Sequence, residues 1–408
     1  MQQHISHLQR YMVGWACAHG GTVMTKLHST IAQLGKLRAL SLQPSPPSDR
    51  GQLSDMEDFG SNPGALRARY YLPQDLGGSD RSRHVPLVVV LHGCTQNADA
   101  YDYGAGWSQL ADELGFALLF PEQRYANNPN RCFNWFAPGD SARGTGEPLS
   151  IRQMIAAMVA AHPIDEARIY VTGLSAGGAM TSIMLATYPE LFAGGAIIAG
   201  LPYGAAASVP EAFASMRGEG YPDDAVLGAL IRSASDHAGP WPTISVWQGD
   251  ADRTVHASNA ERIIAQWQAV HGSDASDVET RTVDGARQRL WRDRDGRVAI
   301  EAYEVIGMGH GTPLAVSGPG ACGVASPYML DAGISSTRHI AAFWGLAEEK
   351  AAMPVEVQAG VQSDPIARVR DPIPFPLRNG ATPSRQASGR VNVGAIIENA
   401  LRRAGIMR

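Results

Sequence analysis

The chain has 408 residues, of which 44% are hydrophobic and 18% are charged, and this balance is ordinary for a globular protein with one large domain or two. A formal net charge of -5 gives no electrostatic reason to expect nucleic acid or an anionic membrane as a partner. No uninterrupted apolar stretch approaches the roughly 18 residues that a bilayer-crossing helix needs, so we expect no membrane span. The expected ligand is therefore neutral or small.

Residues 1–58 are predicted to form an extension ahead of the main domain. Apolar residues recur at helical spacing between residues 22 and 40, and the proline-containing stretch 43–58 is typical of an irregular connector. Residues 11–18 form a weakly apolar patch that ends in Ala-Cys-Ala, which has the small-x-small pattern of a signal-peptide cleavage site. A cytoplasmic extension fits this patch equally well, with Met24 as an alternative start.

Strand and helix patterns alternate through residues 59–346, which we predict to be the main domain. The apolar run at 87–91 has no polar alternation, as expected for a central parallel strand covered on both faces. Further strands are predicted at 66–72, 117–120, 169–172, 196–199, 244–247 and 299–306, and helices at 107–114, 148–161, 178–188 and 257–270. This order predicts an α/β domain with a mainly parallel central sheet flanked by helices.

Two long stretches interrupt this alternation, at residues 125–147 and 201–241. Long loops in compact domains are often functional, so both are candidate pocket walls, although ordinary surface excursions are the alternative. After the main domain, residues 347–408 are rich in proline, glycine and arginine, and apolar spacing at 393–401 predicts a short closing helix.

A Gly-Leu-Ser-Ala-Gly pentapeptide occupies residues 173–177, between the predicted strand 169–172 and the predicted helix 178–188. This is the G-x-S-x-G pattern of a nucleophile elbow, in which glycines flank the serine because larger side chains would obstruct the tight turn that exposes its hydroxyl. The pattern alone occurs by chance, but its setting between a strand and a helix makes Ser175 a candidate nucleophile.

A serine nucleophile needs a base and an acid that orients the base, and on this architecture they follow in the order Ser, Asp, His. An acidic turn follows the predicted strand 244–247, and we favour Asp252 there as the acid. Asp250 is the alternative, although an aspartate in such a turn often bonds nearby backbone N–H groups instead.

Four histidines follow Asp252 in the chain. His310 lies in a glycine-rich turn directly after the predicted strand 299–306, where the backbone can bring the imidazole back across the sheet edge. The others lie beside or within predicted helices, at His256, His271 and His339. We therefore predict His310 as the base.

A tetrahedral oxyanion also needs preorganised N–H donors. The first should be the backbone N–H of Ala176, directly after the nucleophile. The second should come from the loop after the buried strand 87–91, where we favour the N–H of Cys94, although a His-Gly pair after a strand is also a common simple turn.

The four cysteines, Cys17, Cys94, Cys132 and Cys322, contain no C-x-x-C pair with metal or redox spacing. Zinc is therefore not expected, and nothing in the sequence indicates another metal or a cofactor. A single bridge between Cys94 and Cys132 is conceivable in an oxidising compartment.

Four blocks of sequence, in order, resemble the poly(3-hydroxybutyrate) depolymerase family of esterases. They are Leu-His-Gly-Cys-Thr-Gln at 91–96, Cys-Phe-Asn-Trp-Phe at 132–136, the serine pentapeptide with the next glycine at 173–178, and Gly-Leu-Pro-Tyr-Gly at 200–204, and the likeness extends to Gly-His-Gly-Thr-Pro at 309–313. The resemblance implies an α/β-hydrolase fold, a triad of Ser175, Asp252 and His310, and an oxyanion hole formed by Cys94 and Ala176.

The same resemblance implies a disulfide between Cys94 and Cys132 and a substrate groove along the matching blocks. The residues expected to line that groove are Thr95, Gln96, Asn134, Trp135, Leu201 and Tyr203.

The expected function is that of a serine esterase that cleaves short-chain hydroxyalkanoate polyester or oligoester bonds through an acyl-enzyme. The short tail and weak signal favour oligomers or amorphous polyester over crystalline polymer. Alternatives are a feruloyl or acetylxylan esterase, a peptidase or thioesterase with the same triad, and a non-catalytic binding protein on a hydrolase scaffold. The resemblance implies secretion, with a cytoplasmic location as the alternative.

Overall fold

The computed structural model describes residues 52–73 and 84–346 of the chain. The predicted N-terminal helix, the signal-like patch and the tail with its closing helix lie outside the described residues, so these assignments stay predictions.

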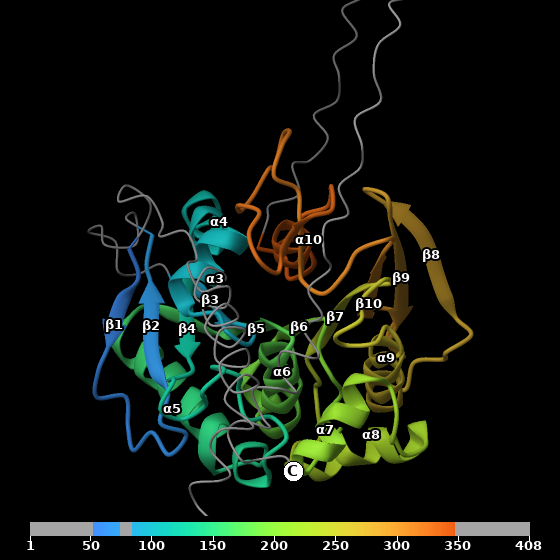
Figure 1. The fold of residues 1–408 in the computed structure, drawn as a ribbon, viewed down its shortest axis with the longest axis horizontal. Helices are drawn as coiled ribbons and strands as arrows, with labels where there is room; N and C mark the ends of the chain where they lie inside the picture. The colour runs from blue at the N-terminus through green and yellow to red at the C-terminus, as the bar shows by residue number, and fades with distance from the viewer. Residues whose placement is uncertain (1–51, 74–83, 347–408) are drawn as a thin grey trace, which may run out of the picture. The chain divides into compact units, whose positions relative to one another are not determined.

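A ten-stranded sheet with the order β1-β2-β4-β3-β5-β6-β7-β10-β9-β8 forms the centre of the described chain (Figure 1). The six strands from β4 to β10 in this order are parallel to one another, and antiparallel strands extend the sheet at both edges. The predicted α/β class with a mainly parallel sheet is confirmed. The strands are β1 (Ser54–Met56), β2 (Arg67–Tyr71), β3 (Val85–Leu91), β4 (Ala117–Glu122), β5 (Ile164–Leu174), β6 (Gly194–Ile198), β7 (Thr243–Gly249), β8 (Val278–Val283), β9 (Ala286–Arg292) and β10 (Val298–Val305).

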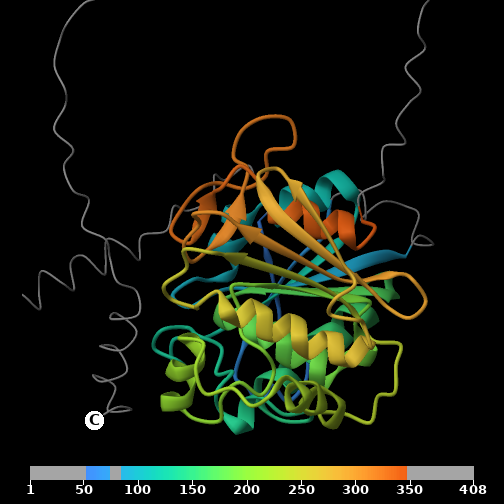
Figure 2. The same cartoon turned by 90° about the vertical axis from the view of Figure 1, so that its right-hand side faces the viewer.

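Helices cover both faces of this sheet (Figures 1 and 2). One face carries α3 (Ala98–Ala105), α4 (Trp107–Leu114) and α10 (Ser336–Phe343), and the other carries α5 (Gly146–Ala161), α6 (Ala176–Thr187) and α9 (Ser258–His271). The predicted interruption at 201–241 contains two more helices, α7 (Val209–Met216) and α8 (Asp224–Ser233), and α8 packs on α9. Short 3-10 turns occupy Pro138–Asp140 and Pro189–Leu191.

Strand β3 shows why the sheet needs cover on both sides. All its residues are buried, and because side chains alternate along a strand, Leu87 and Val89 join the core beneath α5, α6 and α9 while Val88 and Val90 join the core beneath α3, α4 and α10. The continuous apolar run in the sequence therefore reflects two separate hydrophobic cores rather than one.

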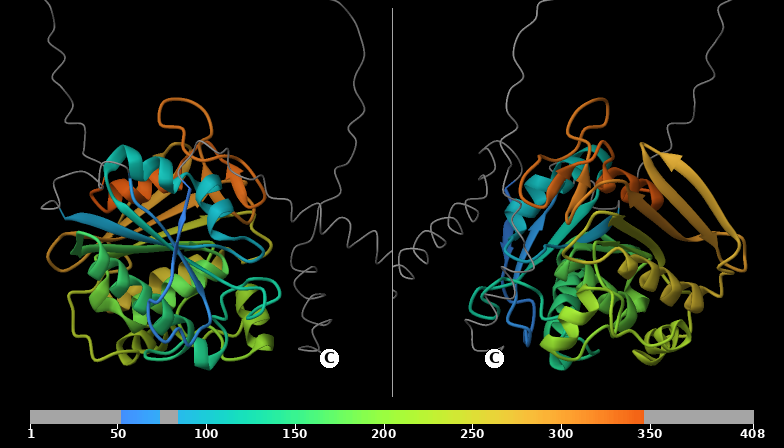
Figure 3. Two further views of the ribbon diagram at one scale, coloured as in Figure 1. Left: turned by 90° about the vertical axis from the view of Figure 1, so that its left-hand side faces the viewer. Right: turned by 45° about the vertical axis from the view of Figure 1, so that its right-hand side comes forward.

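The structure contains strands that the sequence analysis did not predict. β8 and β9 form a hairpin whose two-residue turn, Asp284 and Gly285, has positive φ at both positions, as the favoured Asp-Gly hairpin turn requires. β1 lies within the stretch predicted as a connector and pairs with β2 at the opposite edge (Figure 3). Two short parallel strands, β11 (Thr312–Leu314) and β12 (Met329–Asp331), form a separate small sheet.

A buried carboxyl group joins the strands at one side of the sheet. Glu301 on β10 is 3% exposed, and its two oxygens accept hydrogen bonds from Ser245 Oγ on β7 at 2.7 Å and from Gln288 Nε2 on β9 at 3.0 Å. Burial is the main cause that raises the pKa of Glu301 to about 7. This contact aligns β7 with β10, the two strands that lead to Asp252 and His310.

We expect Glu301 to make the protein less stable as the pH rises. The folded protein holds a proton on Glu301 up to a pH of about 7, whereas the unfolded chain releases it near the ordinary pKa of 4.5. The extra stability is therefore complete below about pH 4.5 and disappears as the pH rises to about 7, a change of about 3 kcal/mol in the free energy of unfolding.

Urea unfolding at about pH 5 and about pH 8 measures this change, and Glu301→Gln should reduce it by about 3 kcal/mol. The matched control is Glu279→Gln, since Glu279 is exposed on β8. An equal pH dependence in the Glu301→Gln variant and the wild type would show that the Glu301 carboxyl is not the source.

Candidate active site

The predicted elbow forms where β5 meets α6. Ser175 has φ 58° and ψ -117°, a positive-φ conformation that residues with side chains rarely adopt. A Cβ on Gly177 would lie 2.2 Å from the Leu91 carbonyl oxygen, and one on Gly173 would lie 2.4 Å from the Gly177 oxygen. Glycine at these two positions lets β3, β5 and α6 approach closely enough to hold Ser175 in the strained turn.

The Ser175 hydroxyl and two N–H groups near it have no hydrogen-bond partner among the described residues. The Ser175 side chain caps no helix N–H and forms no hydrogen bond with His310 or any other described residue. Ala176 is the first residue of α6, so its N–H is one of the unpaired donors at a helix start. Neither this N–H nor that of Cys94 donates to an acceptor within the described ranges. Both donors are therefore free for an external acceptor.

Asp252 and His310 follow two neighbouring strands, β7 and β10, and form a hydrogen bond. His310 Nδ1 lies 2.7 Å from Asp252 Oδ2, and the two side chains are 8% and 0% exposed. Asp252 Oδ1 accepts the backbone N–H groups of Thr254 and Val255 at 2.7 and 3.0 Å. Since Asp252 acts as the acceptor throughout, His310 carries its hydrogen on Nδ1, and Nε2 keeps a lone pair.

Two neighbours hold this pair in place. Gln248 at the end of β7 donates from Nε2 to Asp252 Oδ2 at 3.2 Å. Asp250 Oδ1 accepts the N–H of Gly307 at 2.6 Å, which fixes the start of the turn that leads to His310. Asp250 thus has the backbone-bonding role that the sequence offered as its alternative, and Asp252 is the aspartate that contacts His310. Gln248 was not predicted, and its place directly before the acidic turn was the available signal.

The other histidines after Asp252 bond elsewhere. His256 Nδ1 lies 2.9 Å from Ser258 Oγ, His271 Nε2 lies 3.1 Å from the Pro242 oxygen, and His339 Nε2 lies 2.9 Å from Asp284 Oδ2. Burial lowers the pKa of His271 to about 4, so this side chain is neutral at physiological pH. His310 is the histidine that the fold brings to Asp252.

A ring that the sequence analysis missed flanks His310. Tyr328, just before β12, meets the His310 imidazole edge to face with the ring centroids 6.1 Å apart. Burial raises the pKa of Tyr328, so its phenol is neutral at physiological pH. No pattern in the sequence linked this tyrosine to the histidine, since 17 residues and the small sheet separate them.

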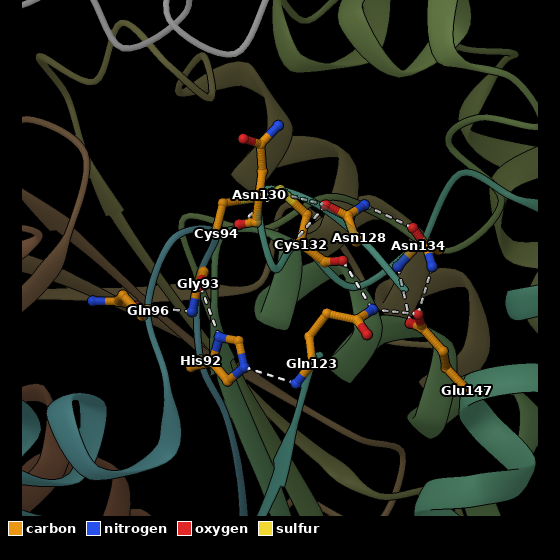
Figure 4. Close-up of a disulfide and its surroundings, with 10 residues drawn as sticks. All are labelled: His92, Gly93, Cys94, Gln96, Gln123, Asn128, Asn130, Cys132, Asn134 and Glu147. Carbon is orange, nitrogen blue, oxygen red and sulfur yellow. Dashed lines mark hydrogen bonds between the residues drawn. A yellow bond between two sulfur atoms is a disulfide. The ribbon is translucent and has the colours of Figure 1, made fainter. Parts of the chain in front are cut away.

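A disulfide joins Cys94, after β3, to Cys132 in the loop after β4 (Figure 4). The Cα atoms lie 4.2 Å apart across a sequence separation of 38 residues. Thr95 reinforces the junction because its N–H donates to the Asn130 oxygen at 2.6 Å. The bridge that the family resemblance implied is therefore present.

The loop that carries Cys132 is organised around a buried carboxyl group, Glu147 at the start of α5. Its oxygens accept hydrogen bonds from Gln123 Nε2 at 2.6 Å and from the Asn134 side-chain and backbone nitrogens at 2.8 and 2.9 Å. Burial, followed by the nearby Asp140 carboxylate, raises the pKa of Glu147 to about 8, while the donated hydrogen bonds oppose this shift. The sequence analysis did not single out Glu147.

Two predicted groove residues belong to the scaffold of this loop. The Asn134 amide donates to Glu147 and accepts from Asn128 Nδ2 at 2.8 Å, so both ends of the amide are engaged internally (Figure 4). Trp135 is 7% exposed and belongs to the core on the α5 and α6 side of the sheet. Their contact with substrate stays a prediction.

The remaining predicted groove residues differ in exposure. Thr95 is exposed and Tyr203 is half-buried, whereas Gln96 and Leu201 are each 1% exposed. Gln96 Oε1 accepts the Gly93 N–H at 2.8 Å, which fixes the loop after β3. Gln266 on α9 holds Tyr203 by two backbone hydrogen bonds of 3.0 Å, one to its N–H and one to its oxygen. Of these four predicted groove residues, Thr95 and Tyr203 are therefore the two whose side chains are accessible to a substrate.

The described residues contain neither a metal-binding cluster nor a membrane-spanning helix. No three His, Cys, Asp or Glu side chains gather there as a metal site. None of the helices in those residues has the length and apolar character needed to cross a bilayer.

The strand order, the elbow after β5 and the acid–histidine pair after later strands define a protein of the α/β-hydrolase fold class. The family described as Esterase PHB depolymerase matches residues 68–289, which is more than half of the chain. The chain therefore belongs to this family of carboxylic ester hydrolases, as the sequence blocks had indicated.

Curated relatives and a solved structure agree with this family. The chain is 43% identical over 296 residues to poly(3-hydroxyalkanoate) depolymerase C of Paucimonas lemoignei, a match that covers 72% of this chain and 70% of that protein. It is 32% identical over 273 residues to acetylxylan esterase A of Emericella nidulans, covering 64% and 85%. An acetyl xylan esterase structure from Aspergillus awamori matches its fold with a TM-score of 0.60 at 23% identity, covering 73% and 100%.

We expect the disulfide to contribute about 4 kcal/mol to the free energy of unfolding, because it closes a loop of 38 residues in the unfolded chain. Urea unfolding of the double variant Cys94→Ser, Cys132→Ser measures this loss. A reductant should destabilise the wild type by a similar amount and leave the double variant unchanged. If the reductant affects both proteins equally, the stability comes from another source.

Proposed function

We propose that this protein is a serine esterase in which His310 takes the proton of Ser175 and the Ser175 oxygen attacks an ester carbonyl. The observation that carries the proposal is the hydrogen bond between His310 Nδ1 and Asp252 at the sheet edge where the Ser175 elbow lies. It orients the imidazole with its Nε2 lone pair free, and Asp252 stabilises the imidazolium that forms. As the ester C–O bond breaks, the His310 imidazolium gives its proton to the leaving alcohol, and water activated by the neutral imidazole then cleaves the acyl-enzyme and restores the Ser175 hydroxyl.

The oxyanion of the tetrahedral intermediate is held by the N–H groups of Cys94 and Ala176. Support comes from the absence of any acceptor for either donor among the described residues and from their positions after β3 and β5, two adjacent strands. Each such donor stabilises a transition state by about 3 kcal/mol. The N–H of Ala176 is further favoured because it lies at the positive end of the α6 dipole.

Ser175→Ala should lower kcat for p-nitrophenyl butyrate by about 10^6-fold while the circular dichroism spectrum stays that of the wild type. Ser233→Ala, which alters an exposed serine on α8, is the matched control and should keep full activity. A fluorophosphonate probe should label the wild type and leave Ser175→Ala unlabelled. A wild type that neither hydrolyses the ester nor takes the probe would indicate a non-catalytic binding protein.

The substrate we propose is a short-chain hydroxyalkanoate polyester or oligoester. The identity of 43% to a poly(3-hydroxyalkanoate) depolymerase exceeds the 32% to an acetylxylan esterase. Exposed apolar side chains also follow the carboxyl ends of two parallel strands, the sheet edge at which Ser175 lies. Tyr125 after β4 is 69% exposed and Ile306 after β10 is 59% exposed. Together with half-buried Tyr203, they add apolar surface at the sheet edge that carries Ser175, and apolar surface there suits a polyester chain better than a hydroxyl-rich polysaccharide.

The disulfide supports a location outside the cytoplasm. A bridge between Cys94 and Cys132 persists in an oxidising compartment and is rare where cellular thiols keep cysteines reduced. We therefore propose that the protein acts in the extracellular space or another oxidising compartment.

A substrate panel separates the ester classes. We expect kcat/KM for a 3-hydroxybutyrate trimer to exceed that for methyl ferulate and for acetylated xylan by roughly tenfold or more, since an apolar site discriminates by about 1–3 kcal/mol. Release of hydroxybutyrate, ferulate and acetate gives the three rates. Faster release of acetate or ferulate would assign the protein to the carbohydrate esterases of the same family.

A further inference from the structure

The N–H proposed as the second oxyanion donor belongs to the peptide group between Gly93 and Cys94. A peptide group is planar and almost always trans, so its N–H and its C=O point in opposite directions. Whatever holds the Gly93 carbonyl oxygen therefore also sets the direction of the Cys94 N–H, although it acts at the far end of the peptide group.

His92 is the residue that holds this carbonyl (Figure 4). Its Nδ1 lies 2.8 Å from the Gly93 oxygen, and its Nε2 lies 3.1 Å from the backbone nitrogen of Gln123. A backbone N–H can only donate, so Nε2 is the unprotonated nitrogen and Nδ1–H donates to the Gly93 oxygen. The two hydrogen bonds together specify one tautomer and one ring orientation.

The surroundings of His92 keep this arrangement rigid and neutral. The residue is 1% exposed, and its ring packs against Phe133 with the centroids 5.1 Å apart. Burial lowers the pKa of His92. A second ring proton would also point at the Gln123 N–H, and the two donors would repel each other. The imidazole therefore stays a donor toward Gly93 and an acceptor toward Gln123.

Gln123 is fixed in turn by Glu147. Its side-chain Nε2 donates to Glu147 Oε1 at 2.6 Å and to the Cys132 oxygen at 3.0 Å, while its backbone N–H donates to His92 Nε2. A buried polar chain thus runs from the start of α5 through the end of β4 to the loop after β3. We call His92, Gln123 and Glu147 the oxyanion relay.

We propose that the oxyanion relay positions the Cys94 N–H, with His92 as the residue that aims it through the Gly93 carbonyl. The inference rests on the proposed serine esterase function and adds positioning residues to it. It gives the buried His92 and Glu147 a role in the reaction rate without any contact with substrate. The disulfide and the hydrogen bond from Thr95 to Asn130 hold the other side of the same loop.

Two substitutions of His92 separate its two hydrogen bonds. In His92→Asn, the amide nitrogen falls near the position of Nδ1 and can still donate to the Gly93 oxygen. In His92→Gln, the longer side chain places its amide near Nε2, where it can accept from Gln123 but no longer holds Gly93. Each variant keeps one hydrogen bond, so both should melt below the wild type by similar amounts.

Their rates should differ. We expect His92→Asn to keep kcat for p-nitrophenyl butyrate within about tenfold of the wild type, and His92→Gln to lose roughly 100-fold in kcat with KM unchanged. Equal kcat values in the two variants, or a loss confined to KM, would overturn the proposal. If the wild type shows no Ser175-dependent hydrolysis, the proposed esterase function is refuted, and the relay's role with it. If the wild type is active but the two His92 variants have equal kcat, the relay proposal alone is refuted.

Glu147→Gln tests the other end of the relay independently, and it applies even if a His92 variant does not fold. The amide replaces one carboxyl oxygen by an NH2 group, whose hydrogens face the N–H donors of Gln123 or Asn134 and cannot accept from them. We expect kcat to fall by about tenfold with KM unchanged. A lower melting temperature with wild-type kcat would show that Glu147 stabilises the fold alone, and that the relay does not position the donor.

Discussion

The close approach of α6 to β3 at the elbow is the constraint on which the site depends. Because Gly177 lies against the Leu91 carbonyl, the end of β3 and the start of α6 cannot separate without leaving a gap in the core. The same contact places the loop after β3 beside Ser175, which turns two adjacent parallel strands into one site. Asp252 and His310 follow β7 and β10. Because β5, β6, β7 and β10 run parallel to one another, both residues lie at the same sheet edge as Ser175.

The features that the sequence predicted well were those with a local cause. The run at 87–91 identified β3 because a strand with two buried faces has no polar positions. The glycines at 173 and 177 identified the elbow because only they fit its turn. Asp252 and His310 were found by their order after strands, and the structure joins them by a hydrogen bond. The Asp-Gly turn of the β8–β9 hairpin had an equally local signal that was not used.

The parts that could not be predicted depend on contacts between distant segments. Glu147 opens a helix and resembles any acidic residue in a first turn, yet the fold buries it completely among amide donors from the loop before it. Asn134 matched a block of the family resemblance, and only the structure shows its amide engaged with Glu147 and Asn128. Burial and partners of this kind are set by tertiary packing, which sequence spacing does not encode.

The disulfide has a topological consequence. Between Cys94 and Cys132 the chain passes through α3, α4 and β4, so the bridge makes this whole crossover a covalently closed ring. A protease that cuts an exposed bond in the ring, such as one beside Tyr125, leaves a single molecule in which the disulfide still joins the loop after β3 to the loop after β4. The bridge therefore turns a backbone break in this crossover into a nick that leaves the two loops joined.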